Sequence, residues 1–376
     1  MMDKWLSPAD QTYVKPTSWL ARLHLDGWLL LGLLLLLGTG LIAIYSASGG
    51  DINVTKNHAI RILLALGLLA VFAQIPPKTL LFFTPWVFIA GLVMLVAVII
   101  FGDTGKGAQR WLDLGIIRFQ PSELMKLALP MMVAWLFAYS AYPAHPARFV
   151  LGFFIVVLTA GLIVVQPDLG TSILIAMSGL FVLFFAGLPW KFIVGALASL
   201  AISLPIVWNF MHGYQKQRVL TFLDPETDPL GAGYHIIQSK IAIGSGGIEG
   251  KGFMGSTQAH LDFLPESTTD FIFSVFAEEF GLIGVVVLLA LYSFVLLRGL
   301  YMAYRAQDVF SRLVVASFTM TLFVYVSVNI GMVSGLLPVV GLPLPLVSYG
   351  GTSMVTLMIS FGIMMSIHTH KKMLSH

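Results

Sequence analysis

The sequence predicts an all-α polytopic membrane protein of about ten transmembrane helices, with one long extracytoplasmic loop between the seventh and the eighth. Of its 376 residues, 57% are hydrophobic and only 10% are charged, whereas an ordinary soluble domain carries about 25% charged residues. The apolar residues form long continuous blocks, and a bilayer core needs roughly 20 apolar residues per helix. A transmembrane barrel would show alternating polarity instead.

The predicted spans follow from these blocks, taken in chain order. They cover 27–46, 58–75, 79–101, 122–141, 148–165, 169–187, 191–211, 271–298, 310–332 and 350–368. The first block, Trp28 to Tyr45, is followed by small residues, which is one feature of a signal peptide. We expect it to be retained as the first helix, because it is long for a signal peptide and many spans follow it.

Basic residues decide the orientation, since an even number of spans places both termini on the same side. One set of tails and helix ends carries most of the cations and only four acids. Those cations are Lys4, Lys15, Arg22, Lys78, Arg148, Lys191, Arg298, Arg305, Arg312, Lys371 and Lys372. Both termini are therefore predicted to be cytoplasmic.

Three segments then lie on the outer side: 102–121, 212–270 and the uncharged stretch 334–351. The segment 212–270 is glycine-rich and long, and we predict it to be a loop within a single transmembrane domain that spans 1–376. The stretch 338–351 is apolar but broken by proline. Such backbone is tolerated at membrane depth only against protein or a cavity, so we expect a re-entrant or capping loop.

The outer side is predicted to be the working face, because 14 of the 18 acidic residues fall there. Ionisable residues within or beside membrane spans are costly and therefore suggest function. The absence of cysteine excludes disulfides, thiolate zinc sites and iron–sulfur clusters. A net charge of +3 without a basic stripe gives no reason to expect nucleic-acid binding.

Acidic residues gather where the loop 212–270 runs into the next span. The simpler interpretation makes Thr269 or Asp270 a cap at the start of that helix. Glu278 and Glu279 follow about two turns later in an otherwise apolar span. A carboxylate at such a low-dielectric boundary suits a general base, and two or three carboxylates together could instead hold a divalent metal.

A second charged group follows the loop 102–121. Glu123 and Lys126 are three residues apart and share one helix face, which predicts a local ion pair. A partner from another helix is an equal alternative for Lys126, and Asp168 at the start of a later span is the candidate. The simpler interpretation of Asp168 is a helix N-cap.

Cations on the outer side could bind the phosphate groups of a lipid-linked substrate. The alternative is simple anchoring to lipid head groups. The candidates are Lys106 and Arg110, the latter beside Trp111, and then Lys216, Arg218, Lys240 and Lys251.

In this order, the motifs resemble the SEDS family (shape, elongation, division and sporulation) over about residues 27–370. Each motif is weak alone, but the series is specific. The matching pieces are Arg110-Trp111, QPSE at 120–123 with Lys126, QPDLGT at 166–171, IAIGSGG at 241–247, GKG at 250–252, LPESTTDF at 264–271, EEFG at 278–281 and PLPLVSYGG at 343–351. The short tails and the ending SIHTH at 366–370 are most similar to the elongation members.

The resemblance implies a peptidoglycan glycosyltransferase of the bacterial inner membrane that polymerises lipid II on the periplasmic side. It makes Asp270 the essential acid and implies that Lys126 and Asp168 pair between helices. The candidate substrate-binding residues are Arg110, Trp111, Glu123, Lys126, Asp168, Arg218, Lys240, Glu266, Glu278 and Ser348. No metal ligand is assigned.

The expected reaction is attack of a sugar 4-hydroxyl on the anomeric carbon of an undecaprenyl-linked glycan, with inversion and release of polyprenyl diphosphate. Asp270 is expected to be the general base. The cations Arg110, Lys126 and Arg218, or a divalent ion (Mg or Mn), would stabilise the leaving group. The resemblance implies a class B penicillin-binding protein as partner, together with the MreB, MreC and MreD system.

Two other functions remain open. A lipid II flippase would use the same lipid groove and outer cations, but charges near the midplane in both halves would favour it, and here they gather at one face. A non-catalytic scaffold for a penicillin-binding protein needs no polar groups at the mouths of helices, so the outer acids disfavour it.

Overall fold

The chain folds mainly into long helices in the computed structural model. The structure describes residues 22–105, 108–113, 118–139, 145–192, 232–261, 263–264 and 266–370, with isolated positions between 194 and 220. Within these residues, seven helices are long and apolar enough to cross a membrane. They are α2 (Gly27–Ala47), α3 (Ile52–Ala73), α4 (Pro77–Phe101), α6 (Pro146–Val165), α12 (Ile272–Tyr304), α13 (Val309–Val333) and α14 (Thr352–Thr369). The predicted multi-pass helical membrane protein is confirmed.

Two further predicted spans form helices that end earlier than expected, α5 (Pro121–Phe137) and α7 (Leu169–Phe185). Conversely, α3 begins at Ile52 rather than at residue 58, because Asp51 caps it by accepting a hydrogen bond from the backbone N–H of Asn53 at 2.7 Å. Most of the predicted span 191–211 and residues 221–231 of the following loop lie outside the described residues, so the full number of crossings stays a prediction.

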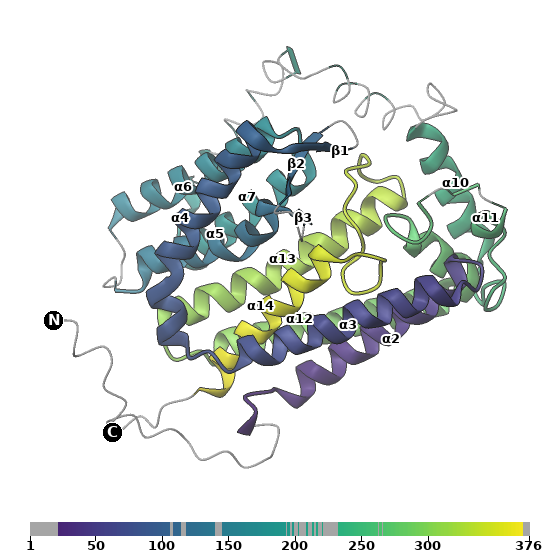
Figure 1. Ribbon diagram of the computed structural model, residues 1–376, viewed down its shortest axis with the longest axis horizontal. Coiled ribbons are helices and arrows are strands. Elements are labelled where there is room, and N and C mark those ends of the chain that lie inside the picture. The colour runs from purple at the N-terminus through teal and green to yellow at the C-terminus, as the bar shows by residue number, and fades with distance from the viewer. Residues whose placement is uncertain are drawn as a thin grey trace.

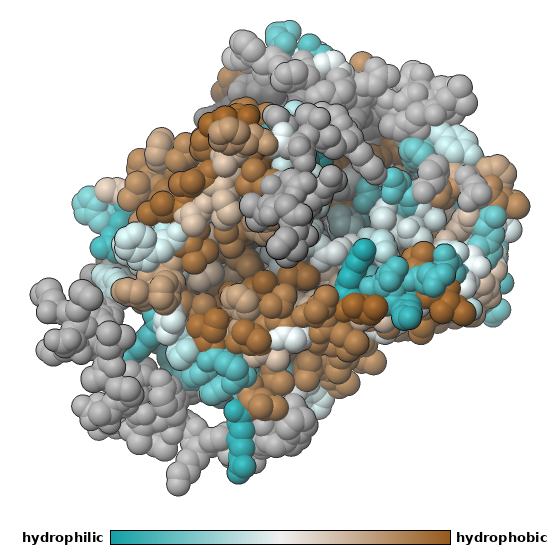
Figure 2. Space-filling model, viewed as in Figure 1, coloured by the Kyte–Doolittle hydropathy of each residue, from teal (hydrophilic) through white to brown (hydrophobic). Residues whose placement is uncertain are grey.

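Helix α13 forms the centre of the bundle and contacts α5, α7, α12 and α14 (Figure 1). On one side, α2 packs on α12 and α3 packs on α14; on the other, α4 packs on α5 and α6 packs on α7. The outward faces of these helices are apolar and exposed, as Figure 2 shows by the broad brown area. Phe82, Trp86 and Phe101 of α4 are examples. These faces suit contact with lipid rather than water.

The outer loop 102–121 contains a small antiparallel sheet, which the sequence analysis did not predict. Strands β1 (Asp103–Gly105), β2 (Ala108–Asp113) and β3 (Arg118–Phe119) follow in the order β1-β2-β3. Because two of the strands have only two or three residues, they are too short for an alternating pattern to appear in the sequence. The sheet carries Arg110 and Trp111 on its middle strand.

Helix α12 is broken at Gly281, which has a φ of +62°. The backbone groups released by the break are satisfied by the glycine-rich segment before it: Lys251 N–H donates to Glu278 O at 2.9 Å and Leu282 N–H donates to Gly247 O at 3.0 Å. A side chain on Gly250 would collide with the backbone of Glu279. The glycines of 246–252 therefore let this segment dock directly on the broken helix.

The first and last described residues meet at one end of the bundle. His24 stacks on His370 with ring centroids 3.7 Å apart. Nearby, Asp26 caps α2 and accepts two hydrogen bonds from Arg298 of α12, at 3.0 and 2.5 Å. Burial acts to raise the pKa of Asp26, but the bonds from Arg298 and the Leu29 N–H outweigh it and hold that pKa below 3.8. The beginning of α2 and the end of α14 therefore lie at the same end of the bundle.

Candidate active site

The turn that carries Asp270 lies immediately before α12. Thr269 donates from Oγ1 to Glu266 Oε2 at 2.8 Å, and Phe271 N–H donates to Glu266 O at 3.2 Å. The N-cap of α12 is Phe271, without any capping bond from a side chain. The prediction that Thr269 or Asp270 caps this helix is therefore wrong. Glu266 instead stabilises the turn that presents the half-buried Asp270.

The loop after α13 holds this turn in place. The Ser348 hydroxyl donates to Thr269 O at 2.6 Å and accepts from Leu344 N–H at 2.8 Å, and Tyr349 N–H donates to Thr268 O at 2.9 Å. Ser348 is buried. Its hydroxyl both donates and accepts within the protein, so it positions the turn beside Asp270.

Asn329 of α13 is a site residue that the sequence analysis missed. It is fully buried, and its Nδ2 donates to Asp270 O at 3.0 Å and to Leu342 O at 2.7 Å. The same loop brings Gly341 to the carboxylate: a Cβ at Gly341 would lie 3.6 Å from Asp270 Oδ2. The sequence did carry one signal for Asn329: it is an amide within an apolar membrane helix, and such groups are rare and need partners.

Lys126 pairs with its own helix neighbour. Its Nζ lies 2.6 Å from Glu123 Oε1, and both side chains are buried. It also lies 5.3 Å from the ring centroid of Tyr325 on α13. Among the described ion pairs, Lys126 does not contact Asp168, so the pair between helices is wrong and the local pair is confirmed.

Asp168 has two other roles. It caps α7 by accepting from Thr171 N–H at 3.3 Å, as the simpler interpretation predicted, and its Oδ2 lies 3.5 Å from Nε of Arg110. Arg110 also donates to Pro167 O at 2.8 Å. One residue into α7, a Cβ on Gly170 would lie 2.9 Å from Val340 O. The start of α7 is thereby placed against the 340–342 loop that reaches Asp270.

Glu278 is fully buried and lies in a hydrogen-bond network of its own. Its carboxylate accepts from Lys251 Nζ at 2.5 Å, from Ser256 Oγ at 2.6 Å and from Thr257 N–H at 3.0 Å. Glu279 accepts from the Ser46 hydroxyl of α2. The network pins the segment 251–258 to α12, so these bonds give Glu278 a structural role, and substrate binding by Glu278 stays a prediction.

The remaining predicted residues lie apart from this cluster or are not among the described residues. Lys240 of α10 (Ala232–Ser245) is exposed, and its Nζ lies beside the backbone of Gly335. Trp111 is half-buried in β2. Arg218 lies outside the described residues. Within the described ranges, no three His, Asp or Glu side chains are grouped closely enough to hold a metal ion.

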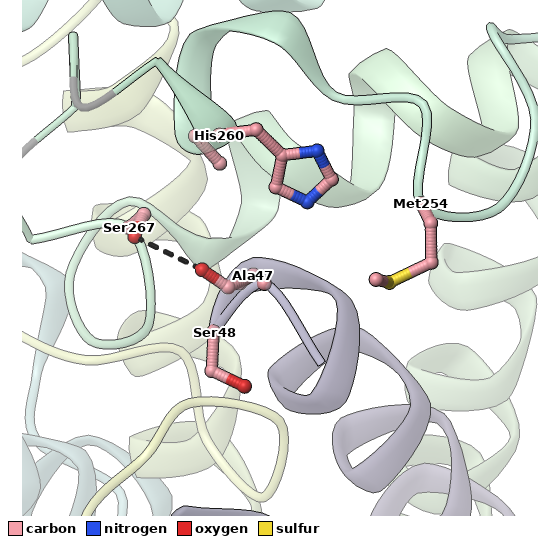
Figure 3. A pocket seen from close by; sticks show the side chains of 7 residues that line it. Ala47, Ser48, Met254, His260 and Ser267 are labelled. Atoms are coloured by element: carbon pink, nitrogen blue, oxygen red, sulfur yellow. Dashed lines mark hydrogen bonds between the residues drawn. The ribbon is translucent and has the colours of Figure 1, made fainter. Parts of the chain in front are cut away.

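A cavity of about 620 Å³ is lined in part by Ser267, three residues before Asp270 (Figure 3). Its walls are the end of α2, at Ala47 to Gly49, and the segment that carries Met254, His260 and Ser267. The Ser267 hydroxyl donates to Ala47 O at 3.5 Å. Small polar side chains and a histidine suit an uncharged polar ligand more than a lipid tail.

Comparison with known proteins places the chain in one family. The family of FtsW, RodA and SpoVE, described as "Cell cycle protein", matches residues 22–373. "Peptidoglycan glycosyltransferase MrdB" of Escherichia coli (strain K12) is 54% identical over 362 residues, which cover 96% of this chain and 98% of MrdB. "Probable peptidoglycan glycosyltransferase FtsW" of Synechocystis is 35% identical, over 93% of this chain and 88% of that protein.

Solved structures agree with this placement. A chain from a structure described as "Structural coordination of polymerization and crosslinking by a peptidoglycan synthase complex" is 31% identical, with a TM-score of 0.80 over 91% of this chain and 97% of that chain. Thermus thermophilus RodA is 27% identical, with a TM-score of 0.69 over 91% of this chain and 96% of that one. The chain therefore belongs to the SEDS family, the family of FtsW and RodA.

Proposed function

We propose that this chain is a peptidoglycan glycosyltransferase that polymerises lipid II, with Asp270 as the general base. The activity named for its relative MrdB, which matches nearly the whole chain, supports the reaction class. The position of Asp270 supports its role. Its turn is held by Ser348 and Asn329 through backbone oxygens, and its carboxylate lies close to Gly341. Such preorganisation is what a general base requires.

The reaction is one displacement with inversion. The 4-hydroxyl of the acceptor sugar loses its proton to the Asp270 carboxylate while its oxygen bonds to the anomeric carbon of the donor. The bond from that carbon to the diphosphate oxygen breaks, and polyprenyl diphosphate leaves. One base is enough for inversion, which agrees with Glu278 being committed to internal bonds.

The negative charge that develops on the leaving group requires cations. Arg110 is partly exposed at the outer rim, so it is available to a diphosphate even while paired with Asp168. Lys126 is buried and paired with Glu123, so it acts as a fixed positive charge in the interior of the site. Arg218 keeps its predicted role. A divalent ion (Mg or Mn) would arrive with the diphosphate, because the described side chains do not form a cage for it.

The setting of this reaction is the bacterial inner membrane, with the Asp270 face in the periplasm and both termini in the cytoplasm. The apolar outer surface of the helices supports a lipid-linked substrate. We expect a class B penicillin-binding protein as partner, in line with the neighbouring peptidoglycan synthase complex. The MreB, MreC and MreD system would place this partnership in cell elongation.

Labelled lipid II distinguishes this proposal from the two alternatives. The purified chain and its transpeptidase partner are reconstituted in liposomes, and both glycan length and lipid II transfer between leaflets are measured. Long glycan chains without leaflet transfer are expected. Leaflet transfer without glycan would establish a flippase, and neither activity beside a stable partner complex would establish a scaffold.

A further inference from the structure

Arg61 is a charged residue that no role above explains. It lies about 14 Å along α3 from the outer end of that helix, by its place in the chain. Its guanidinium lies 4.5 Å from the ring centroid of Tyr349. None of the ion pairs of the described residues includes Arg61. A cation at this depth without a carboxylate is costly and suggests a ligand of opposite charge.

The beginning of α14 lies at the same place. Gly351 is its N-cap, and no side chain caps the helix. The Cδ and Nε atoms of Arg61 are 4.0 Å from the position that a Cβ on Gly351 would take. The free N–H groups of a helix start carry partial positive charge. Two positive features in contact repel each other unless an anion lies between them.

A third group points to the same ligand. His58, one turn before Arg61 on α3, is completely buried, and neither ring nitrogen has a hydrogen-bond partner. Its ring centroid lies 5.6 Å from that of Tyr349. A buried polar group without a partner costs free energy, and native proteins rarely keep one without a reason. An acceptor atom bound beside Tyr349 would satisfy it.

The loop that carries Tyr349 connects this place to the reaction. Tyr349 N–H donates to Thr268 O at 2.9 Å, two residues before Asp270. On the inner side, Ser353 in the first turn of α14 lies close to Tyr325, which contacts Lys126. The start of α14 is therefore bordered by Arg61 on one side and by the Lys126 group on the other.

We propose that Arg61, His58 and the start of α14 form a binding site for the diphosphate of the polyprenyl-linked substrate. The inference rests on the proposed function. A phospholipid head group offers similar phosphate chemistry, but the hydrogen bond from Tyr349 to the Asp270 turn favours the reacting lipid. Two adjacent phosphates also match a guanidinium and a helix start better than a single phosphate does.

Binding of undecaprenyl diphosphate to the full chain in phosphatidylethanolamine nanodiscs tests this site. Arg61→Gln is expected to weaken binding about ten- to hundredfold, as for loss of one charge-assisted contact. Arg61→Lys, which keeps the charge, is expected to lose less. Lys56→Gln is the matched control, because Lys56 is exposed on the same helix and should bind as wild type does. Thermal unfolding of each variant separates loss of the site from loss of the fold.

Equal binding by Arg61→Gln and wild type would overturn the proposal. Phosphatidylglycerol is tested as a second ligand. If Arg61→Gln weakened only the binding of phosphatidylglycerol, the site would belong to a bilayer lipid and the proposal would be overturned. Asp270→Asn is included in the same experiment and should bind the diphosphate normally. Arg61-dependent binding by a chain that polymerises nothing would keep the site and reject the glycosyltransferase, and polymerisation with Arg61-independent binding would do the reverse.

Discussion

Replacing Glu278 by glutamine changes one atom in the network that pins the segment 251–258 to α12. Both carboxylate oxygens accept bonds: Oε1 from Lys251 and Thr257, and Oε2 from Ser256 at 2.6 Å and Gln258 N–H at 3.3 Å. A glutamine offers only one oxygen. In either orientation its NH₂ group faces other donors, so the variant loses bonds and gains a donor–donor contact.

The expected loss of unfolding free energy is about 3 kcal/mol. Removing one partner of a buried ion pair costs about 3–5 kcal/mol, and a hydrogen bond to a charged group contributes roughly 1.5–3 kcal/mol. The lower end of the range of about 3–5 kcal/mol applies. Glu278 is fully buried, but the Lys251 side chain is 30% exposed, so water replaces part of its bond. The Ser256 and Thr257 bonds are lost only in part.

Unfolding of the purified protein in mild detergent, followed by thermal melting or by graded denaturant, measures this effect. Glu249→Gln is the matched control, since Glu249 is an exposed acid of the same loop and its loss should change stability by less than about 0.5 kcal/mol. A Glu278→Gln variant as stable as the control would refute the structural role. Wild-type stability with lost lipid II binding would restore Glu278 as a substrate ligand.

Three further predictions follow from other contacts of the structure. Ser348→Ala removes the bond to Thr269 O of the 266–271 turn and the bond from Leu344 N–H, and we expect about 1–3 kcal/mol lower stability and reduced polymerisation, while unchanged stability and polymerisation would contradict the positioning role. Glu123→Gln leaves Lys126 buried without a carboxylate and should cost about 3 kcal/mol, with Glu123→Asp as a milder comparison in the same melting assay. Burial lowers the pKa of both His24 and His370 below 6.5, so their neutral forms favour the fold; stability is full above pH 6.5 and falls as pH drops through the lowered values. A melting temperature that is flat from pH 7.5 to 5, or a His370→Asn variant with the same slope as wild type, would contradict that link.

The membrane spans could be predicted from the sequence because each depends only on local composition. The helices α2, α4 and α6 begin and end within a few residues of the predicted limits. The resemblance to the SEDS family also singled out Asp270, a charge at the edge of an apolar block, as the expected general base. These signals lie within one segment of chain and need no knowledge of packing.

Contacts between distant segments could not be predicted in the same way. The i, i+3 spacing of Glu123 and Lys126 already allowed the local pair, but nothing in the sequence excluded Asp168 as partner. The acids 278 and 279 seemed available to a ligand because their partners come from a loop 20 residues or more away and from α2. The hydrogen bonds of Asn329 depend on how the loop after α13 folds back on that helix.

Polymerisation of labelled lipid II by Asp270→Asn, with its transpeptidase partner present, tests the central claim most directly. Asparagine keeps the shape of the side chain and leaves the backbone bond from Asn329 intact, so the variant should fold and bind lipid II like wild type. With no base to accept the hydroxyl proton, it should form glycan at least about a hundredfold more slowly. Wild-type glycan synthesis by this variant would show that another group removes the proton and that Asp270 is not the general base.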